Sequence, residues 1–530
     1  MNNMKDTFFR WIPWLIIILG IILRLDQYLF NRSLWLDEAF LAVNVIERSF
    51  LGLFVAPLEY SSHIIPPGVL VMAKLSMTLF GNSDLVLRLF PFVCGSLSLI
   101  LFYYLAKAYL SARAVPIALF FFAISEALIF YSSEFKEYSS DVLIVIALFL
   151  LAHYIRNHCL NFERLFLLAI AGILAVWFSH ISVFILAPIG IYIAWPYLLN
   201  KQWKSLIDLV AIYWLWFFNF LLLFAFIRQI DAPTNEWMYQ FWHLENAFIP
   251  SPISWDSFHW LYHNFFVFLE EPGGLKNLKL AGFVVILGSI ALFAEKKGLL
   301  FLLTLPILLA LSFSLFEQYP FSGQQLLFLI PALYLILAEG IVRLQIKNLS
   351  SSFASFYTSV LTLILVGLLA FFPTYKAIKH LSVPRLKEEI KPILEYVQTN
   401  RQNQDIIYIY HWAEPTFRYY ANNYGFNYND CQIITPIPQN EYLKGVDYSR
   451  IKRDLKPVSV ANTQCILGIH ETFAQAQPDL AKLQGQSRVW LVFSHIDESE
   501  RNRFLNYLDT RGKQKDAKLQ PNASVYLYQL

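Results

Sequence analysis

The sequence predicts a polytopic α-helical membrane protein that ends in a soluble α/β domain. Of its 530 residues, 57% are hydrophobic and only 15% are charged, whereas soluble domains average about 45–50% apolar and about 25% charged residues. The charges are unevenly distributed, because 18 of the 41 Lys and Arg and 16 of the 38 Asp and Glu lie in 384–530. We therefore divide the chain into a membrane region, 1–383, and a soluble domain, 384–530.

The composition also excludes other classes of protein. A net charge of +3 provides no basic surface for nucleic acid, so no nucleic-acid partner is expected. Disordered chains contain far fewer apolar residues. Four Cys without a CxxC pair form neither a disulfide framework nor a zinc pattern. The partners that this composition implies are membrane lipids.

Eleven apolar segments have the length of membrane-spanning helices, which need roughly 20 mostly apolar residues. They are 11–30, 86–108, 115–131, 139–156, 164–179, 181–199, 206–228, 278–294, 298–316, 324–343 and 355–374. Two long loops, 31–85 and 229–277, separate some of these spans. Within the first loop, the apolar stretch 69–79 is too short to cross a bilayer, so we expect an interfacial helix there.

The basic residues of the short loops predict the orientation. Alternate loops each hold two of them near the membrane edge: Lys5 and Arg10, Lys107 and Arg113, Arg156 and Arg164, Lys201 and Lys204, Lys296 and Lys297, and Arg343 and Lys347. Because such loops remain in the cytoplasm, the N-terminus is predicted to lie inside. The long loops and the soluble domain are then extracytoplasmic, and the protein is a multi-pass protein of the inner (plasma) membrane.

The soluble domain alternates between helical and strand-like segments. Helices are predicted at 388–400, 414–423 and 498–511, and strands at 406–410, 489–494 and 524–528. This order predicts a small α/β layer structure. No glycine-rich phosphate loop is present, which argues against nucleotide binding. Cys431 and Cys465 either form a disulfide in this domain or remain two free thiols.

Two adjacent carboxylates follow the first span. Asp37 and Glu38 lie in the motif WLDEAF at 35–40, and apolar residues recur around them at helical spacing. This pattern predicts a short amphipathic helix that begins at Asp37 or Glu38 and lies on the bilayer surface. Two interpretations remain open, because acidic residues in a first turn stabilise a helix and can also serve a site.

Three charges are confined to the short turn YSSEFKEY at 131–138. Charged groups between two apolar helices are costly unless they are paired or belong to a site. Glu134 and Tyr138 share a face if the following helix begins early. Glu134 and Lys136 are therefore either a solvated ion pair or residues of a site.

Further candidates lie in the other outer segments. Arg88, at the edge of the second span, is either an interface anchor or a site residue. His180, in a short turn, is either an ordinary hydrogen-bonded histidine or a ligand. The remaining candidates are residues of the predicted outer segments: His63, Arg228, Tyr319 and Gln324.

Several motifs together resemble one family of membrane enzymes. They are WLDEAF at 35–40, FGNSDLVLRL at 80–89, YSSEFKEY at 131–138, SHISVF at 179–184, QQLLFLIPAL at 324–333 and RVWLVFSHID at 488–497. Their order resembles that of the protein O-mannosyltransferase superfamily of C-type glycosyltransferases, in particular the bacterial branch that includes the aminoarabinose transferase acting on lipid A. No single motif is specific, but together they cover nearly the whole chain. The resemblance implies the GT-C fold.

The resemblance also implies a reaction. Such enzymes take a sugar from a polyprenyl-phosphate donor on the extracytoplasmic face and transfer it, with inversion, to a lipid, glycan or protein acceptor. Asp37 is then the general base, Glu38 orients the acceptor or a metal ion, and Glu134 is a further carboxylate of the site. A divalent metal ion is expected only if these three carboxylates converge with His63 and His180.

The departing lipid phosphate requires positive charge. Arg88, Lys136 and Arg228 are the cations predicted near the outer face. Two positions depart from the pattern of the family: Lys136 stands where Arg is usual, and Gln324 or Gln325 occupies a place often held by Arg. Since Lys lacks the bidentate geometry of Arg, we do not carry over the identity of the donor.

Three other functions compete with this interpretation. A transporter or flippase of lipid-linked sugars is expected to show internal repeats and broken spans near the midplane, and we find no such pair. A non-catalytic scaffold would depend on 384–530 rather than on Asp37. A glycan polymerase or ligase of similar fold would share the base and use a longer donor.

Overall fold

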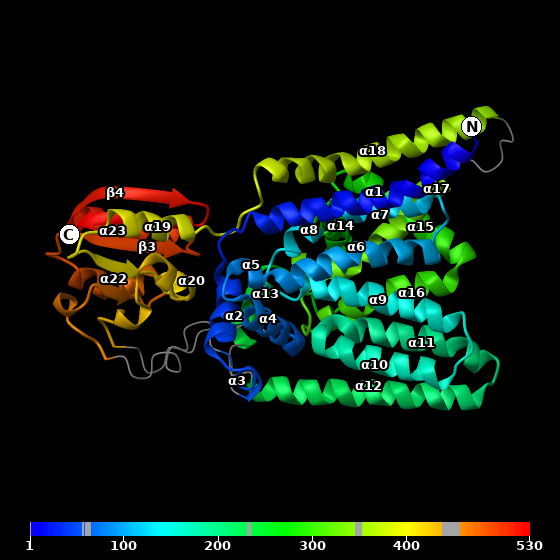
Figure 1. Ribbon diagram of the computed structural model, residues 1–530, viewed down its shortest axis with the longest axis horizontal. Coiled ribbons are helices and arrows are strands. Elements are labelled where there is room, and N and C mark those ends of the chain that lie inside the picture. The colour runs from blue at the N-terminus through cyan, green and yellow to red at the C-terminus, as the bar shows by residue number, and fades with distance from the viewer. Residues whose placement is uncertain (1, 56–57, 59–64, 231–234, 345–351, 437–455) are drawn as a thin grey trace.

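The computed structural model (Figure 1) describes residues 2–55, 58, 65–230, 235–344, 352–436 and 456–530. Long helices pack side by side in one part of the molecule, and the α/β domain lies at one end of this bundle. Shorter helices lie between the two parts, and the N-terminus lies at the far end of the bundle from the α/β domain.

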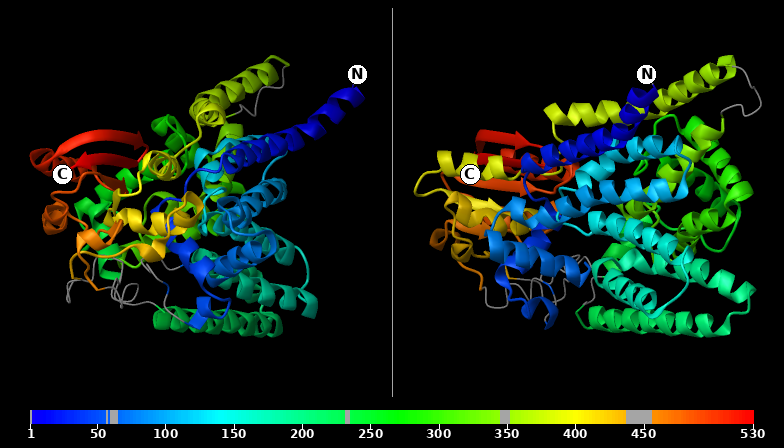
Figure 2. Two further views of the ribbon diagram at one scale, coloured as in Figure 1. Left: turned by 60° about the vertical axis from the view of Figure 1, so that its left-hand side comes forward. Right: turned by 45° about the vertical axis from the view of Figure 1, so that its right-hand side comes forward.

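The bundle consists of α1 (Asn2–Leu29), α6 (Leu89–Tyr109), α9 (Tyr138–Arg156), α10 (Phe162–Phe178), α11 (Val183–Leu199), α12 (Trp203–Ile230), α15 (Leu278–Glu295), α16 (Lys297–Leu315), α17 (Ile330–Arg343) and α18 (Ser352–Ser382). The first and the last of these helices are in contact along one edge of the bundle (Figures 1 and 2). In the described part of the chain, nine helices are long and apolar enough to cross a membrane. A polytopic helical membrane region is therefore confirmed, whereas the count of eleven spans stays a prediction.

The predicted span 115–131 is divided into two helices, α7 (Ala114–Ile124) and α8 (Glu126–Tyr131). Arg24 of α1 lies at the break, where its guanidinium donates to two carbonyl groups in the last turn of α7, at 3.2 and 3.3 Å. Carbonyls at the C-terminal end of a helix have no partner within it, and a cation there also complements the helix dipole. Arg24 therefore stabilises the end of α7 at this position.

Both long loops contain helices. The first contains α2 (Leu36–Glu47), α3 (Gly52–Val55), α4 (Pro67–Phe80) and α5 (Asp84–Leu87), and the second contains α13 (Asn235–Leu244) and α14 (Trp255–Glu270). The two helices predicted within the first loop are present as α2 and α4, and their position at the bilayer surface stays a prediction. The 3₁₀ helices η1 (His180–Ser182) and η2 (Gly323–Leu329) precede α11 and α17.

The soluble domain is a five-stranded mixed sheet with helices. Its strands are β1 (Ile406–Ile409), β2 (Cys465–Leu467), β3 (Val489–Ser494), β4 (Lys513–Gln520) and β5 (Ala523–Gln529), in the spatial order β2-β1-β3-β5-β4. β1 pairs in parallel with β2 and β3, and β5 pairs antiparallel with β3 and β4. The helices are α19 (Lys391–Asn400), α20 (Glu414–Tyr420), α22 (Phe473–Lys482) and α23 (Glu498–Arg511). Residues 383–390, the connecting segment, join α18 to α19.

The predicted α/β order is confirmed, and β3 and α23 begin and end where the sequence places them. The sequence pattern does not reveal β2, which has only three residues. It also does not reveal β4, whose sequence KQKDAKLQ is polar and largely exposed. A polar edge strand protects the sheet from pairing with other chains, and this protection removes the apolar alternation by which a strand is recognised.

The soluble domain and the first long loop share one hydrophobic core. Leu36 and Phe40 of α2 and Val69 of α4 belong to the same buried cluster as Tyr410 and Phe417 of the soluble domain. Helices α2 and α20 are in direct contact. Burial of apolar surface stabilises such a contact by roughly 25 cal/mol per Å². The soluble domain is therefore packed against the loop that carries the predicted site, and is not only tethered to it.

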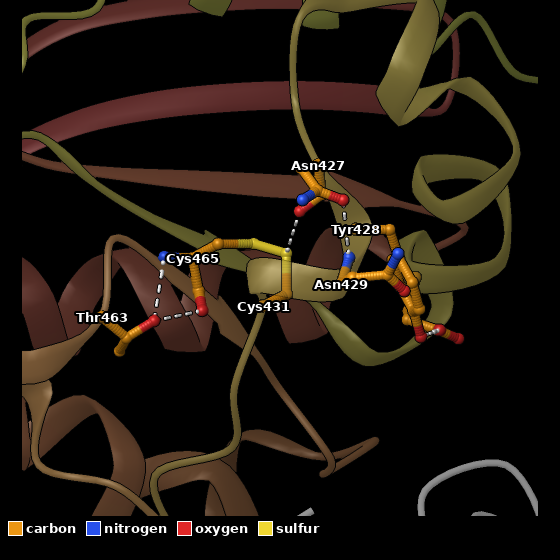
Figure 3. Close-up of a disulfide and its surroundings, with 7 residues drawn as sticks. Asn427, Tyr428, Asn429, Cys431, Thr463 and Cys465 are labelled. Atoms are coloured by element: carbon orange, nitrogen blue, oxygen red, sulfur yellow. Dashed lines mark hydrogen bonds between the residues drawn. A yellow bond between two sulfur atoms is a disulfide. The ribbon is translucent and has the colours of Figure 1, made fainter.

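A disulfide joins Cys431 to Cys465, the first residue of β2 (Figure 3). Next to it, Gln432 forms an isolated parallel bridge with Ile466. Of the two possibilities that the sequence leaves open, the bonded pair is the one observed. Disulfides persist in oxidising compartments, so the bond agrees with the predicted extracytoplasmic position of the domain.

Removal of this disulfide should destabilise the soluble domain. The bond joins residues 34 positions apart, and closure of such a loop corresponds to about 3–4 kcal/mol. We expect Cys431→Ser combined with Cys465→Ser to lower the unfolding temperature by roughly 6–16 °C in calorimetry. Cys159→Ser, which changes an exposed free thiol, is the control. An unchanged unfolding temperature in the double variant would contradict the prediction.

Candidate active site

The candidate site is built around the first turn of α2. Trp35 precedes the helix, and Leu36, Asp37 and Glu38 begin it. The N–H groups of a first turn have no partner within the helix, so carboxylates are favoured there. Glu38 accepts a hydrogen bond from the N–H of Trp35 at 3.4 Å, and Glu388 of the connecting segment accepts one from the N–H of Leu36 at 3.1 Å. Two carboxylates from distant parts of the chain thus stabilise this turn.

Glu38 and Arg88 form a buried ion pair in which both side chains are at most 1% exposed. Nε and Nη2 of Arg88 donate to the two carboxylate oxygens of Glu38, at 2.8 and 2.6 Å. Glu38 also accepts from the N–H of Phe135 at 2.7 Å, and Arg88 donates to the carbonyls of Arg32 and Ser33. These additional hydrogen bonds offset the cost of burying two charges. The pair joins α2 to the start of α6 and to the turn after α8.

The surroundings of Glu38 determine its ionisation. Burial alone would raise the pKa of Glu38, but the charges of Arg88 and Arg32 and the hydrogen bonds to the carboxylate outweigh burial and lower the pKa to about 2. Glu38 is therefore ionised across the physiological pH range. Because a general base works best with a pKa near the operating pH, Glu38 is suited to a structural role and not to proton abstraction.

Asp37 points in another direction. Successive residues of an α-helix are rotated by roughly 100°, so Asp37 does not share the buried face of Glu38. Its side chain is 14% exposed, and its carboxylate lies 3.4 Å from the ammonium of Lys136, which is 2% exposed. Asp37 is thus a carboxylate that remains accessible beside a buried cation.

A second buried network surrounds Glu134, whose side chain is 0% exposed. Its Oε2 lies 3.6 Å from Nη2 of Arg32 and 3.2 Å from Nζ of Lys387. The ammonium of Lys387 also lies 3.5 Å from the ring centroid of Trp35, where the quadrupole of the ring attracts a cation. The connecting segment thereby places a second lysine over the ring of Trp35, which lies two residues before Asp37.

Tyrosine side chains form one wall near these networks. The rings of Tyr131 and Tyr138 are 4.9 Å apart, and the hydroxyl of Tyr131 donates to Gln324 of η2 at 3.4 Å. His180 of η1 is half-buried, and its Nε2 has no hydrogen-bond partner among the residues that the structure describes. Tyr131, Tyr138 and Gln324 are thus in contact, and η1, which carries His180, packs against α9.

Two acids, the half-buried Glu137 and the buried Asp141, lie one turn apart at the start of α9. Burial raises the pKa of Glu137; the charge of Lys136 lowers it in part, and those of Glu134 and Asp37 raise it again. Burial, followed by the charges of Asp141 and Glu137, raises the pKa of the nearby Tyr319 well above its usual value. The surroundings of Glu137 and Tyr319 thus disfavour the charged forms of both side chains.

Charged residues of KEEIK at 387–391 connect the soluble domain to the site by hydrogen bonds and ion pairs. Beyond Lys387 and Glu388, described above, Glu389 accepts from the N–H and the hydroxyl of Ser33, at 3.2 and 2.9 Å. Lys391 forms an ion pair of 2.9 Å with Asp84. The sequence signal for this role is a short run of mixed charges soon after the last helix of the membrane region, which resembles any solvated segment.

The structure brings part of the predicted set together. The predicted residues in the two ion-pair networks are Asp37, Glu38, Arg88, Glu134 and Lys136. Those near the wall are Tyr138, His180, Tyr319 and Gln324. His63 and the side chain of Arg228 lie outside the described residues. Residues that sequence reasoning missed are Arg32, Asp141, Lys387, Glu388 and Glu389.

The described donors do not fit a divalent metal ion. Glu38 and Glu134 each face two cationic side chains, and Asp37 faces Lys136. Among the described residues, no group of three or more His, Cys, Asp or Glu is arranged as a metal site. The Arg and Lys side chains thus already pair with the carboxylates that a divalent ion would need.

The chain is similar to solved membrane proteins over nearly its whole length. It matches ArnT from Cupriavidus metallidurans bound to undecaprenyl phosphate with a TM-score of 0.54 and 11% identity, and ArnT in the apo state with 0.53 and 12%; each match covers 99% of this chain and 98% of the other. The chain has the GT-C fold. The archaeal oligosaccharyltransferase AglB from Archaeoglobus fulgidus, in complex with an inhibitory peptide and a dolichol-phosphate, matches with a TM-score of 0.50 and 12% identity, over 98% of this chain and 74% of AglB.

These matches confirm, at the level of the fold, the resemblance to C-type glycosyltransferases that the motifs indicate. They also confirm the predicted fold class, a polytopic helical membrane region followed by a C-terminal α/β domain. No protein-family model and no curated protein matches the chain.

Replacement of Glu38 should destabilise the protein. Glu38→Gln leaves Arg88 buried without its counter-charge, which typically costs about 3–5 kcal/mol. We expect a clear fall in unfolding temperature and in folded yield, measured on the purified protein in nanodiscs. Asp37→Asn is the matched control, because it changes the adjacent and partly exposed carboxylate.

The same variant should change the response to acid. The folded pKa of Glu38, about 2, lies below the unfolded value of 4.5, so its stabilising contribution is present above pH 4.5 and is lost as the pH falls towards 2. The unfolding temperature of the wild type should therefore fall more steeply with acidification than that of Glu38→Gln. Parallel curves would count against this prediction.

Proposed function

We propose that the protein is an inverting glycosyltransferase, which moves a sugar from a polyprenyl-phosphate donor to a hydroxyl group of a lipid, glycan or protein. The observation that carries this proposal is the accessible carboxylate of Asp37 next to Lys136, with the ammonium of Lys387 nearby over Trp35. A base and cations in one site are what transfer from a phosphate-linked sugar requires. The structures of ArnT with undecaprenyl phosphate and of AglB with a dolichol-phosphate support the class of donor.

The proposed reaction is a single displacement. Asp37 takes the proton from the acceptor hydroxyl while the oxygen of that hydroxyl forms a bond to the anomeric carbon. The bond between this carbon and the phosphate oxygen breaks, and its electron pair leaves with the lipid phosphate. Attack from the opposite face inverts the configuration and needs no nucleophilic side chain. A positioned base of this kind contributes typically ~10²–10⁴-fold to the rate.

The two lysines are the groups proposed to receive the lipid phosphate. Each ammonium group has three donors, whereas Arg88 uses its guanidinium on Glu38 and on two backbone carbonyls. Lys136 and Lys387 contact Asp37 and Glu134 on one side and retain donors for a further anion. Stabilisation of the negative charge that develops on the leaving group lowers the barrier.

The extracytoplasmic face is the proposed location of the reaction. The distribution of Lys and Arg in the short loops predicts that the first long loop lies outside. The soluble domain packs on this loop and contains the Cys431–Cys465 disulfide, which suits an oxidising compartment. Polyprenyl-phosphate donors and membrane acceptors would reach the site along the bilayer.

The role of Asp37 can be tested by sugar transfer in nanodiscs, with a panel of radiolabelled polyprenyl-phosphate sugars and native membrane extract. Asp37→Asn should reduce the rate by about 10²-fold or more because the base is removed, at unchanged folded yield. Glu47→Gln is the matched control, since Glu47 lies at the other end of α2 and pairs with Arg418. Equal rates for wild type and Asp37→Asn would exclude Asp37 as the base, and no transfer from any donor would count against a transferase.

The role of Lys387 can be tested by binding of undecaprenyl phosphate. Lys387→Gln removes a cation from the proposed phosphate site, so we expect the dissociation constant to rise roughly five- to tenfold. Microscale thermophoresis on the detergent-solubilised protein would measure it. Lys379→Gln, which removes an exposed lysine from the end of α18, should leave the affinity unchanged. Equal affinities for both variants would contradict the assignment.

A further inference from the structure

The end of the sheet that most often binds ligands is turned towards the site. In open α/β sheets, ligands bind outside the carboxyl ends of the parallel strands. Strand β3 ends at Ser494, and His495 follows it directly. Both residues contact Glu388 of the connecting segment, which in turn binds the first residue of α2. The soluble domain thus presents a histidine at the helix that carries Asp37.

The carboxylate of Glu388 is the centre of this contact, and its side chain is 4% exposed. One oxygen accepts from the N–H of Leu36 at 3.1 Å and from the hydroxyl of Ser494 at 3.4 Å. The other oxygen lies 2.5 Å from Nδ1 of His495. Leu36 immediately precedes Asp37, so a single carboxylate fixes both the backbone of the catalytic turn and the ring of His495.

The backbone of His495 is unusual. Its φ of +52° lies in the left-handed region, which is uncommon for residues other than Gly. The N–H of His495 donates to the carbonyl of Asn522 at 3.2 Å, and its side chain is 44% exposed. Such conformations persist where the surrounding structure holds them, and they concentrate at functional sites. Glu388 and Asn522 provide the restraint here.

The charges around His495 are mainly negative. Burial lowers the pKa of His495, but the hydrogen bond and charge of Glu388, and then the charges of Asp37 and Asp497, outweigh burial and raise it. Trp412, the neighbouring aromatic residue, has its ring centroid 6.3 Å from that of His495 and carries no charge. The geometry agrees, because the carboxylate of Glu388 bridges the imidazole and the N–H of Leu36, the residue that precedes Asp37.

We propose that Glu388 and His495 are positioning residues of the active site, through which the connecting segment and the soluble domain hold Asp37 and control its ionisation. This inference rests on the proposed function of Asp37. Glu388 restrains the first turn of α2, and the imidazolium of His495 favours the ionised form of Asp37, which is the form that accepts a proton. The soluble domain then contributes a positioning residue, His495, to the active site.

The first test is the pH dependence of transfer by the full-length protein in nanodiscs. In the wild type, the positive charge of His495 lowers the pH at which Asp37 is protonated. Without this charge, His495→Gln should move the acidic limb of kcat/KM upwards by roughly half a pH unit, less than the one to three units of a close buried pair because the ring is partly exposed. Glu388→Gln should reduce kcat more than it raises KM for the donor, because the catalytic turn is less well held.

The control for these variants is Asp405→Asn. Asp405 is a buried carboxylate of the same domain, paired with Arg488 and hydrogen-bonded to Trp490. Its loss should lower the stability of the domain and leave the acidic limb in place. A limb that does not move in His495→Gln, or that moves equally in Asp405→Asn, overturns the proposal.

The second test does not need an identified donor. The raised pKa of His495 contributes stability that is present below pH 6.5 and is lost as the pH rises through the raised value. The unfolding temperature of the wild type should therefore exceed that of His495→Gln by more at pH 6 than at pH 8.5. When both proteins also carry Asp37→Asn, this pH-dependent difference in unfolding temperature should shrink, since one cause of the raised pKa of His495 is removed.

The two tests separate failure of the inference from failure of the proposed function. If Asp37→Asn leaves the pH-dependent difference in unfolding temperature unchanged, His495 and Asp37 are not coupled, and the inference is overturned. Coupling in the unfolding experiment without transfer from any donor supports the pairing of the two residues and rejects the transferase. Coupling together with a shifted acidic limb supports both.

Discussion

The arrangement of the site depends on the buried ion pair between Glu38 and Arg88. Neither charge would be stable in this apolar position without the other, and their additional hydrogen bonds bind the turn after α8 and the chain before α2. The first turn of α2 is thereby fixed to two segments that are distant in sequence. Because adjacent helical residues point in different directions, burial of Glu38 leaves Asp37 exposed beside Lys136. One motif therefore provides both a structural anchor and an accessible carboxylate.

The soluble domain depends on the same turn. Its hydrophobic core continues into α2 and α4. The charged side chains of KEEIK at 387–391 contact several residues of the site. Lys387 reaches Glu134, Glu388 reaches the N–H of Leu36, and Glu389 reaches Ser33. These contacts are buried or partly buried and cooperate with apolar packing, which distinguishes them from isolated surface ion pairs of little energetic value. Motion of the soluble domain away from the loop would therefore disturb the first turn of α2.

Local patterns in the sequence predict the helices and turns of the site, but not which charged side chains pair with one another. The helical spacing after Asp37 predicts α2 correctly. The cost of charge between apolar helices singles out Glu134 and Lys136, and the structure shows both of them in buried ion pairs. The sequence cannot distinguish the roles of Asp37 and Glu38, because that distinction depends on Arg88, whose partner is set by tertiary packing. The sequence also cannot assign Lys387 to the site. Its contacts are with Glu134 and Trp35, which are distant in sequence, and such contacts produce no local periodicity.

On the proposed function, the choice of lysine and arginine within the site follows a physical rule. The two buried arginines face the two buried glutamates, and the planar fork of Arg88 binds a carboxylate at two points, as a permanent contact requires. Lysine is a compact charge on a flexible stem, so Lys136 can exchange a carboxylate for a phosphate at small structural cost. An arriving phosphate that draws Lys136 away from Asp37 would leave this carboxylate more basic at the moment when the acceptor proton must be removed. In this arrangement, a single ion pair links donor binding to activation of the base.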